Sequence, residues 1–483
     1  MKIKHFVTTA ILFISCALLF ACAKAERSNE NDPKSDDFQI STSIRPVSGS
    51  VIVGHEPIRI TFEDTMDTAS SPVFTGTMST AADNATLAWT TTSNTNDTLT
   101  INPNVGNIYP SGTGATLTVT CNNISGAPIT VSLSYTVEYA VYVRKTDSSN
   151  SDPGTRVKPR TAIQAGIIQA DAFYSTARVN VAGGTYSSNY RSTTYPVIDM
   201  VENISVYGGY SDNFSERNVT TYETIIEDTS TSLGSTASPN RVVNCSNTID
   251  GSAANTVIDG FTIKLGGGEC NAGIFCQGNI TISHNIISGK TSTTLVVTDV
   301  HGISILSTSS LTVSPIISYN TIDPGYGNST TSKTYGIYSS GYDATHLATA
   351  QIDYNIITGG NGRYTYGIQD INYSNSSILN NTKIDCGVGS VLAYCINIDT
   401  NCHPAIESNT FSNDSGLTTT RYGICEQSSS SNPSRVRNNH FDFSTSNLEV
   451  YYYDEGIDPP VKDFTTAVST EEGSQTLTYW SNY

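Results

Sequence analysis

The chain contains a repeated motif, a Gly-Ile or Cys-Ile pair that occurs six times between positions 273 and 424. The copies begin at Gly273, Gly302, Gly336, Gly367, Cys395 and Gly423. Successive copies lie 29, 34, 31, 28 and 28 residues apart. Self-similarity at such a period is the sequence signature of a fold that stacks one structural unit on the next.

A second motif follows each copy, an asparagine with an apolar residue two positions later. It occurs as Asn285/Ile287, Asn320/Ile322, Asn355/Ile357, Asn409/Phe411 and Asn439/Phe441, whereas Asn381 is followed by an apolar residue only at Ile384. The segments between the motifs are short, rich in β-branched residues and bounded by turn-forming residues, so they are predicted strands. We therefore expect each repeat to be one coil of a parallel β-helix, with the isoleucines in one inward column. The asparagines would form a column at a bend, where they tolerate left-handed backbone and hydrogen-bond to their neighbours. A sandwich of irregular hairpins is the alternative, but it does not require recurring pairs.

These repeats and the segment before them resemble the right-handed parallel β-helix of the pectin-lyase-like superfamily, in which asparagine ladders and aliphatic stacks are family features. The preceding segment contributes Asp-Pro-Gly-Thr at 152–155, Val-Asn-Val-Ala-Gly-Gly-Thr-Tyr at 179–186 and Ile-Ser-Val-Tyr-Gly-Gly-Tyr at 204–210. This order is similar to the opening of bacterial surface β-helix proteins. The resemblance covers residues 141–483 and implies a fold, not an activity.

A short amphipathic helix is predicted at 160–173, where Ile163, Ile167 and Ala170 fall at helical spacing. It directly precedes the first strands of the β-helix. Because the open end of a β-helix exposes unpaired backbone groups, we expect this helix to be its N-terminal cap.

The N-terminus has the pattern of an export signal. Lys2 and Lys4 precede a mostly apolar stretch at 6–20, and Leu-Phe-Ala-Cys at 19–22 resembles a bacterial lipobox. This resemblance implies that residues 1–21 are a lipoprotein signal peptide and that Cys22 carries the lipid; an ordinary secretory signal peptide is the alternative. Residues 22–38 are polar and acidic, which predicts a disordered tether. We expect a lipoprotein of the cell envelope, anchored at the outer membrane or cell surface through its N-terminal lipid.

Residues 39–140 are predicted to form a β-sandwich. Alternating apolar and polar residues recur at 58–62, 98–101 and 115–119, and turn signals separate these runs. The order of these segments resembles a bacterial Ig-like domain. Such domains mostly serve as spacers or adhesive modules. With a β-sandwich followed by a β-helix, the chain as a whole is predicted to be all-β.

Charge and cysteine content narrow the classes of partner. The formal net charge is -18 at neutral pH, whereas a nucleic-acid-binding domain carries a basic surface.

Eight cysteines remain after Cys16 and Cys22, and an even number in an exported chain permits disulfides. In the register of the repeat, Cys395 and Cys425 would lie close enough for a bridge or for simple ladder packing. Cys270 and Cys276 could close a small loop, and buried free thiols are the alternative for each cysteine. No Cys-x-x-Cys pair or compact Cys/His cluster occurs, which disfavours zinc.

An enzymatic function is one interpretation of the resemblance, because many β-helix relatives cleave acidic polysaccharides. Lyases use a basic residue with calcium, and hydrolases use clustered carboxylates. By register the candidates are Asp370 and Glu426, two coils apart, and Asp399, which alternates to the opposite side of its strand. The characteristic motifs of the hydrolases are missing from the sequence.

A binding surface is the function we favour from the sequence. Insertions of different length fall at the bends of the repeat, and in stacked-repeat proteins such loops often form the binding face. They contain Tyr326, Tyr338, Tyr342 and Tyr364 beside polar residues, a combination suited to sugar rings. We expect a scaffold for adhesion to glycans or to host or matrix proteins; the alternatives are a polysaccharide lyase or glycoside hydrolase and a purely structural envelope component.

Overall fold

The computed structural model describes most of the chain from Ser43 onward. The described residues are 43–188, 197–229, 240–266, 270–289, 299–327, 331–413, 420–443, 449–454, 471–472 and 475–476. The predicted signal peptide, Cys22 and the tether lie outside these residues. No helix in the described ranges is long and apolar enough to span a membrane.

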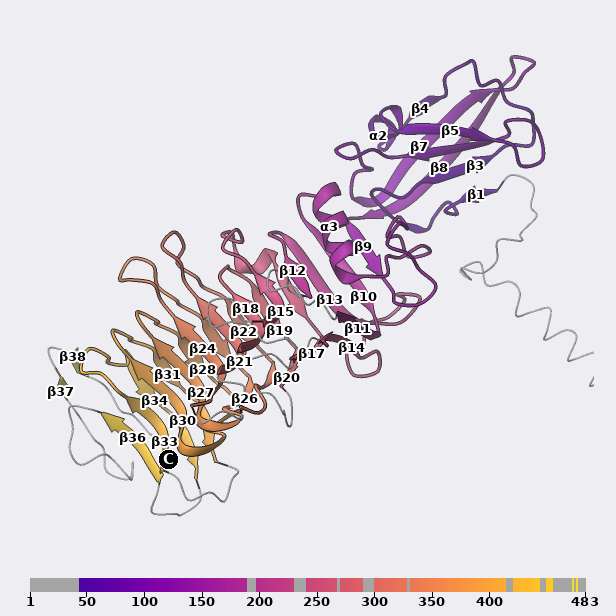
Figure 1. Ribbon diagram of the computed structural model, residues 1–483. Coiled ribbons are helices and arrows are strands. Elements are labelled where there is room, and N and C mark those ends of the chain that lie inside the picture. The colour runs from indigo at the N-terminus through magenta and orange to yellow at the C-terminus, as the bar shows by residue number, and fades with distance from the viewer. Residues whose placement is uncertain are drawn as a thin grey trace, which may run out of the picture.

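Two four-stranded sheets form a β-sandwich at one end of the molecule (Figure 1). One sheet contains, in spatial order, β1 (Ile44–Arg45), β3 (Ile58–Thr61), β6 (Thr98–Asn102) and β5 (Thr86–Thr90). The other contains β2 (Val51–Val53), β8 (Pro128–Glu138), β7 (Gly112–Asn122) and β4 (Val73–Thr75), with the short helix α2 (Ser79–Asp83) beside β4. Alternate residues such as Ile58, Ile60 and Leu99 face a shared core, as the sequence pattern predicts for an Ig-like sandwich.

The rest of the described chain winds into a right-handed parallel β-helix with three long sheets. Sheet 1 contains β9 (Ala140–Val143), β10 (Ala177–Ala182), β13 (Ile204–Tyr210), β16 (Val257–Asp259), β19 (Thr281–Ser283), β22 (Ile316–Ser318), β25 (Gln351–Asp353), β28 (Ser377–Leu379), β31 (Ala405–Glu407) and β34 (Arg435–Arg437). Sheet 2 contains β11 (Gly184–Ser188), β14 (Thr224–Asp228), β17 (Thr262–Lys264), β20 (Ile286–Ser288), β23 (Thr321–Asp323), β26 (Ile356–Thr358), β29 (Lys383–Asp385), β32 (Thr410–Ser412) and β35 (His440–Asp442). Sheet 3 contains β12 (Ile198–Met200), β15 (Asn240–Cys245), β18 (Cys270–Cys276), β21 (Asp299–Leu306), β24 (Lys333–Ser340), β27 (Asn361–Ile371), β30 (Val388–Asp399), β33 (Thr420–Glu426) and β36 (Glu449–Asp454). Each coil runs from sheet 1 through sheet 2 to sheet 3, and the coils follow one another as an elongated stack from α3 to β36 (Figure 1).

The six isoleucines of the first motif form the predicted inward column. In sheet 3, Ile274 pairs with Ile303, and the column continues through the later coils to Ile424. All six side chains are fully buried in one continuous core. The register that the motif implies is therefore confirmed.

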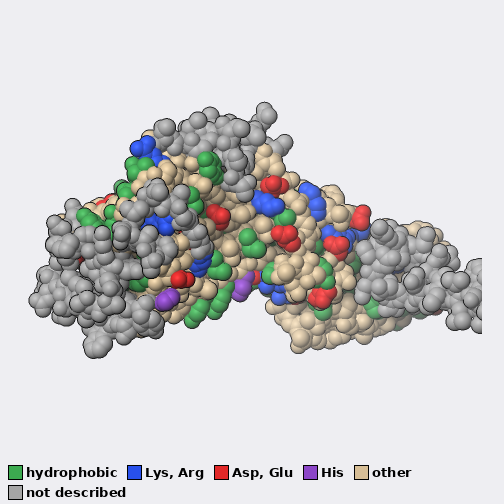
Figure 2. Space-filling view, turned by 90° about the horizontal axis from the view of Figure 1, so that it is seen from below, with side chains coloured by type: hydrophobic (Ala, Val, Ile, Leu, Met, Phe, Trp, Pro, Cys, Tyr) green, Lys and Arg blue, Asp and Glu red, His purple; other side chains and the backbone are tan. Residues whose placement is uncertain are grey.

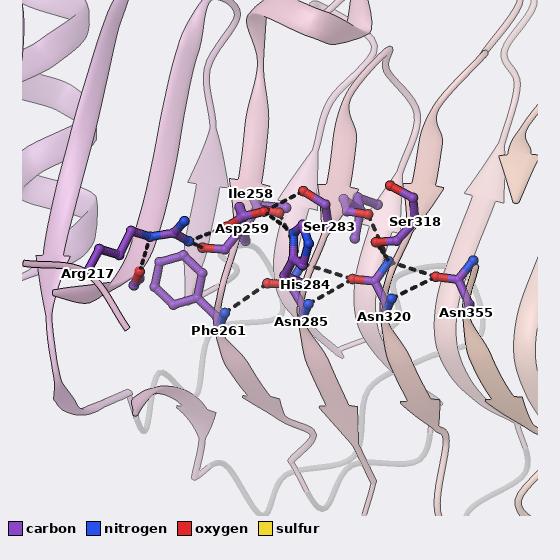
Figure 3. Close-up of polar contacts among 12 residues, drawn as sticks. Arg217, Ile258, Asp259, Phe261, Ser283, His284, Asn285, Ser318, Asn320 and Asn355 are labelled. Carbon is purple, nitrogen blue, oxygen red and sulfur yellow. Dashed lines mark hydrogen bonds and ion pairs between the residues drawn. The ribbon is translucent and has the colours of Figure 1, made fainter. Parts of the chain in front are cut away.

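The asparagines of the second motif form a hydrogen-bonded ladder between sheets 1 and 2 (Figure 3). Asn285 Nδ2 donates to Asn320 Oδ1 at 3.2 Å, and Asn320 Nδ2 donates to Asn355 Oδ1 at 3.0 Å. The same bond recurs through Asn381 and Asn409 to Asn439. Each side-chain amide thus forms hydrogen bonds with backbone N–H and carbonyl groups that have no partner within the sheets at the bend.

Helix α3 (Ile163–Phe173) covers the first coil, as the sequence predicts. Ile163, Ile167 and Ala170 are buried against β9 and β10. At Gly166 a Cβ atom would lie 2.6 Å from a methyl carbon of Val143, so the helix approaches the sheet as closely as only glycine permits.

Candidate ligand-binding surface

Two of the three candidate carboxylates point into the β-helix. Asp370 and Glu426 lie in one column of sheet 3, separated by Ile398, and both are at most 1% exposed. Asp370 accepts hydrogen bonds from the backbone N and Oγ of Ser376, at 3.2 and 2.8 Å. Burial raises the pKa of Asp370 to about 6. The two-coil spacing is as predicted, but a sugar polymer outside the coil has no access to these side chains.

Asp399 lies at the end of β30 and is half-buried, next to the buried Ile398. It accepts a hydrogen bond from Thr400 Oγ1 at 3.0 Å. Because a glycosidase needs two carboxyl groups that flank the same sugar bond, Asp399 with two carboxyls inside the coil does not make such a pair. In the described part of the chain, no group of three His, Cys, Asp or Glu residues is placed to hold a metal ion.

Tyr338 and Tyr364, two of the four predicted ligand-binding tyrosines, pack into a cluster on the outer side of sheet 3. This tyrosine cluster consists of Tyr335, Tyr366, Tyr394 and Cys425, with Tyr338, Tyr364, Leu392, Tyr422 and Tyr453 packed against it. Its central rings stack at centroid distances of 4.8 and 5.1 Å and are at most 7% exposed. Because these central rings are almost entirely buried, a ligand has no access to them, and the cluster stabilises the coils.

The other two predicted tyrosines lie elsewhere. Tyr342 follows β24, is 58% exposed, and its ring meets that of His346 edge-on at 6.2 Å. Tyr326 is half-buried and forms a bridge with Asn361. The four tyrosines therefore do not form one surface.

A different set of aromatic side chains does form one exposed surface, at the bends between sheets 1 and 2. His284, Tyr319 and Tyr354, which we name the aromatic file, occupy equivalent positions in three successive coils. Their rings are nearly parallel, with interplanar angles of 4° and centroid distances of 5.2 and 5.1 Å. Tyr319 is 54% exposed and Tyr354 is 44% exposed. These residues were not predicted as site residues.

The position of the aromatic file follows from the asparagine ladder. Each of the three residues directly precedes a ladder asparagine and has a left-handed φ between 52° and 57°. At such a bend the asparagine turns inward and the residue before it turns outward. The aromatic file could therefore have been found in the sequence, because an aromatic residue directly precedes three successive ladder asparagines.

Aliphatic side chains extend the aromatic file onto sheet 2. Ile286 and Ile356 are 51% and 43% exposed, and Thr321 pairs with both on the strand between them. The two isoleucines flank the ladder asparagines on the sheet 2 side, as Tyr319 and Tyr354 do on the sheet 1 side, and we name these four residues the apolar strip. Exposed apolar side chains that gather in this way commonly mark a binding site.

Polar side chains hold His284, at one end of the aromatic file, in place (Figure 3). His284 Nδ1 lies 2.8 Å from Asp259 Oδ2, and Arg217 forms an ion pair with the same carboxylate. Burial opposes ionisation of Asp259, but hydrogen bonds from Ser283, Arg217 and His284 outweigh it and lower its pKa. Asp353, in the column next to the file, accepts a hydrogen bond from Gln351 Nε2 at 3.0 Å.

Charged side chains of both signs are interspersed on the described part of one face of the molecule (Figure 2). On the face in Figure 2, acidic and basic side chains lie among uncharged groups, and its described part presents no continuous basic stripe.

Comparison of the chain with protein-family models, curated proteins and solved structures found no match.

Proposed function

We propose that this protein is an exported, lipid-anchored binding scaffold, and that the aromatic file and its flanking isoleucines bind a neutral glycan. The observation that carries the proposal is the exposure of Tyr319 and Tyr354 as parallel rings in one file. The anchor follows from the lipobox-like sequence that ends at Cys22. The tether and the sandwich would then hold the β-helix away from the membrane.

A sugar chain suits the chemistry of the strip. The C–H groups of a pyranose ring pack on apolar and aromatic surface, and the hydroxyls around its rim need hydrogen-bonding partners. Ile286, Tyr319, Tyr354 and Ile356 supply the apolar surface, while the tyrosine hydroxyls and Asp353 supply partners. Coils repeat about every 4.8 Å along the axis, a distance comparable to the length of one sugar unit in an extended glycan.

The charges nearby favour a neutral ligand. Asp353 and Asp259 lie in the outward column of sheet 1 beside the file, and Asp323 lies on sheet 2. The guanidinium of Arg217 is paired with Asp259. Since carboxylates of a polyuronate would approach carboxylates of the protein, the acidic polysaccharides that many β-helix enzymes cleave suit this surface less well.

The test is binding of the full chain to a panel of glycans. Cello- and xylo-oligosaccharides represent neutral chains, and polygalacturonate and alginate represent acidic ones. The proposal expects binding to at least one neutral glycan, its loss in the double variant Tyr319→Ala/Tyr354→Ala, and its retention in Tyr342→Ala, which removes an exposed tyrosine outside the strip. Unchanged binding by the double variant, or binding to the acidic glycans alone, would overturn it. New reducing ends or unsaturated products in the same incubations would instead support the enzymatic alternative.

A further inference from the structure

The β-helix interior brings four of its cysteines together in two pairs, neither of which is a pair that the sequence suggested. The strand β18 extends from Cys270 to Cys276, which separates these two residues by about 20 Å at about 3.3 Å per residue. Cys395 lies in the core of the β-helix, whereas Cys425 lies in the tyrosine cluster outside it. Both suggested bridges are therefore excluded by this geometry.

We infer that Cys245 is joined to Cys276, and Cys386 to Cys395, by disulfide bonds when the chain folds in an oxidising compartment. All four are thiols in the structure, and all four are fully buried in the same core. This inference concerns a covalent modification and does not depend on what the outer surface binds.

Cys245 and Cys276 are direct neighbours on β15 and β18. They are paired in register in sheet 3, and both side chains belong to the core. Adjacent strands lie about 4.8 Å apart, and disulfide-bonded residues have Cα atoms roughly 4.4 to 6.8 Å apart. The Cys276 thiol also donates to Gly278 O at 3.1 Å, which keeps it at this rung.

Cys386 and Cys395 meet across the corner between sheets 2 and 3 of one coil. The backbone N of Cys386 and the thiol of Cys395 both donate to the carbonyl oxygen of Ser412, at 3.4 and 3.5 Å. Burial and a hydrogen bond with the Cys386 side chain raise the pKa of the Cys395 thiol far above its ordinary value. The two thiols therefore lie in contact.

The chemistry requires a disulfide oxidant, such as oxidised glutathione. One cysteine attacks the oxidant as a thiolate and forms a mixed disulfide, and its partner then attacks the protein sulfur and releases the second glutathione thiolate. Each bond thus removes two protons and two electrons from the protein and yields two molecules of reduced glutathione. A hydrogen bond with Cys276 and burial raise the pKa of the Cys245 thiol, so the reaction belongs to the folding stage, before the coil closes over the pair.

Peptide mapping of the full chain tests the inference. The reduced chain is refolded from urea in a glutathione redox buffer, then unfolded with an alkylating reagent and no reductant. Trypsin, which cuts after Arg241, Lys264 and Lys290, should release peptides 242–264 and 265–290 as one cross-linked species. Chymotrypsin, which cuts after Tyr394 and Phe275, separates Cys386 from Cys395 and Cys270 from Cys276.

The expected result is two specific links in most molecules, with Cys121, Cys402 and Cys425 alkylated as internal controls. In the variant Cys245→Ala, Cys276 should become fully alkylated while the link between Cys386 and Cys395 persists. Full alkylation of all four cysteines, or links that include the control cysteines at similar yield, would overturn the inference. A chain refolded without oxidant should be fully alkylated and should regain the same circular dichroism spectrum.

Discussion

Asn355 Nδ2 donates to Asn381 Oδ1 at 3.1 Å, across the coil in which the sequence motif is interrupted. One extra residue separates Asn381 from the next inward residue, Ile384, yet Ile384 still pairs with Ile357 in sheet 2. The ladder therefore continues through an insertion that shifts the apolar residue. The asparagine column, and not the residue spacing alone, sets the register at this bend.

Replacing Asn355 with alanine should destabilise the β-helix strongly. Asn355 Oδ1 accepts from the backbone N and Nδ2 of Asn320, and its Nδ2 donates to Ile317 O at 2.8 Å. Because the side chain is fully buried, the variant leaves several polar groups without partners, and we expect a loss of about 3 kcal/mol or more. Urea unfolding followed by circular dichroism measures it. The exposed Asn361→Ala is the control, and equal unfolding midpoints for the two variants would contradict the role of the ladder.

Acidification should weaken the junction between sandwich and β-helix through His55. Its Nε2 donates to Pro153 O at 2.6 Å, and its Nδ1 accepts from the Tyr174 hydroxyl. Burial lowers the pKa of His55 to about 4, so the folded state holds the neutral ring. The stability it contributes is present above the unfolded pKa near 6.5 and is lost as the pH falls through 4, a change of about 3 kcal/mol. His55→Gln should remove this part of the pH dependence; an unchanged acid profile would contradict the assignment.

Glu56, beside His55, should produce the opposite dependence. Burial raises its pKa to about 7, and its Oε2 accepts from Val53 N at 3.1 Å. A protonated carboxyl in the folded state contributes stability below the unfolded pKa near 4.5, and this contribution is lost as the pH rises through 7. We therefore expect the stability of Glu56→Gln, compared with that of the native chain at the same pH, to be higher at pH 8 than at pH 4. Thermal melts at both pH values measure the difference, and a constant difference would contradict the prediction.

The membrane anchor is tested by Cys22→Ser. If Cys22 carries the lipid, the native chain incorporates radiolabelled palmitate and sediments with membranes, whereas the variant does neither. A native chain without label would contradict lipidation at Cys22 and would favour the alternative of an ordinary export signal. Cys16→Ser, within the predicted signal peptide, is the matched control and should be labelled normally.

The stacking of the coils could be predicted from the sequence because Ile and Asn recur at each inward position, but the orientation of other side chains could not. Tyr335 packs in the tyrosine cluster and Ile337 in the core, although residues two apart face the same side of a regular strand. Asp370, by contrast, lies two residues after the inward Ile368 and faces inward as regular alternation requires. Tyr319 and Tyr354 escaped prediction because they lie beside the ladder asparagines and not in the insertions between motifs. Cys245 and Cys276 lie 31 positions apart, and only the register of β15 and β18 makes them neighbours.

The central claim is that the aromatic file is where the ligand binds. Titration calorimetry with the tightest-binding neutral oligosaccharide, on the native chain and on Tyr319→Ala, tests it most directly. We predict binding weaker by about tenfold or more, which corresponds to about 1.4 kcal/mol, with an unchanged unfolding midpoint because Tyr319 is 54% exposed. An affinity equal to that of the native chain would contradict the claim.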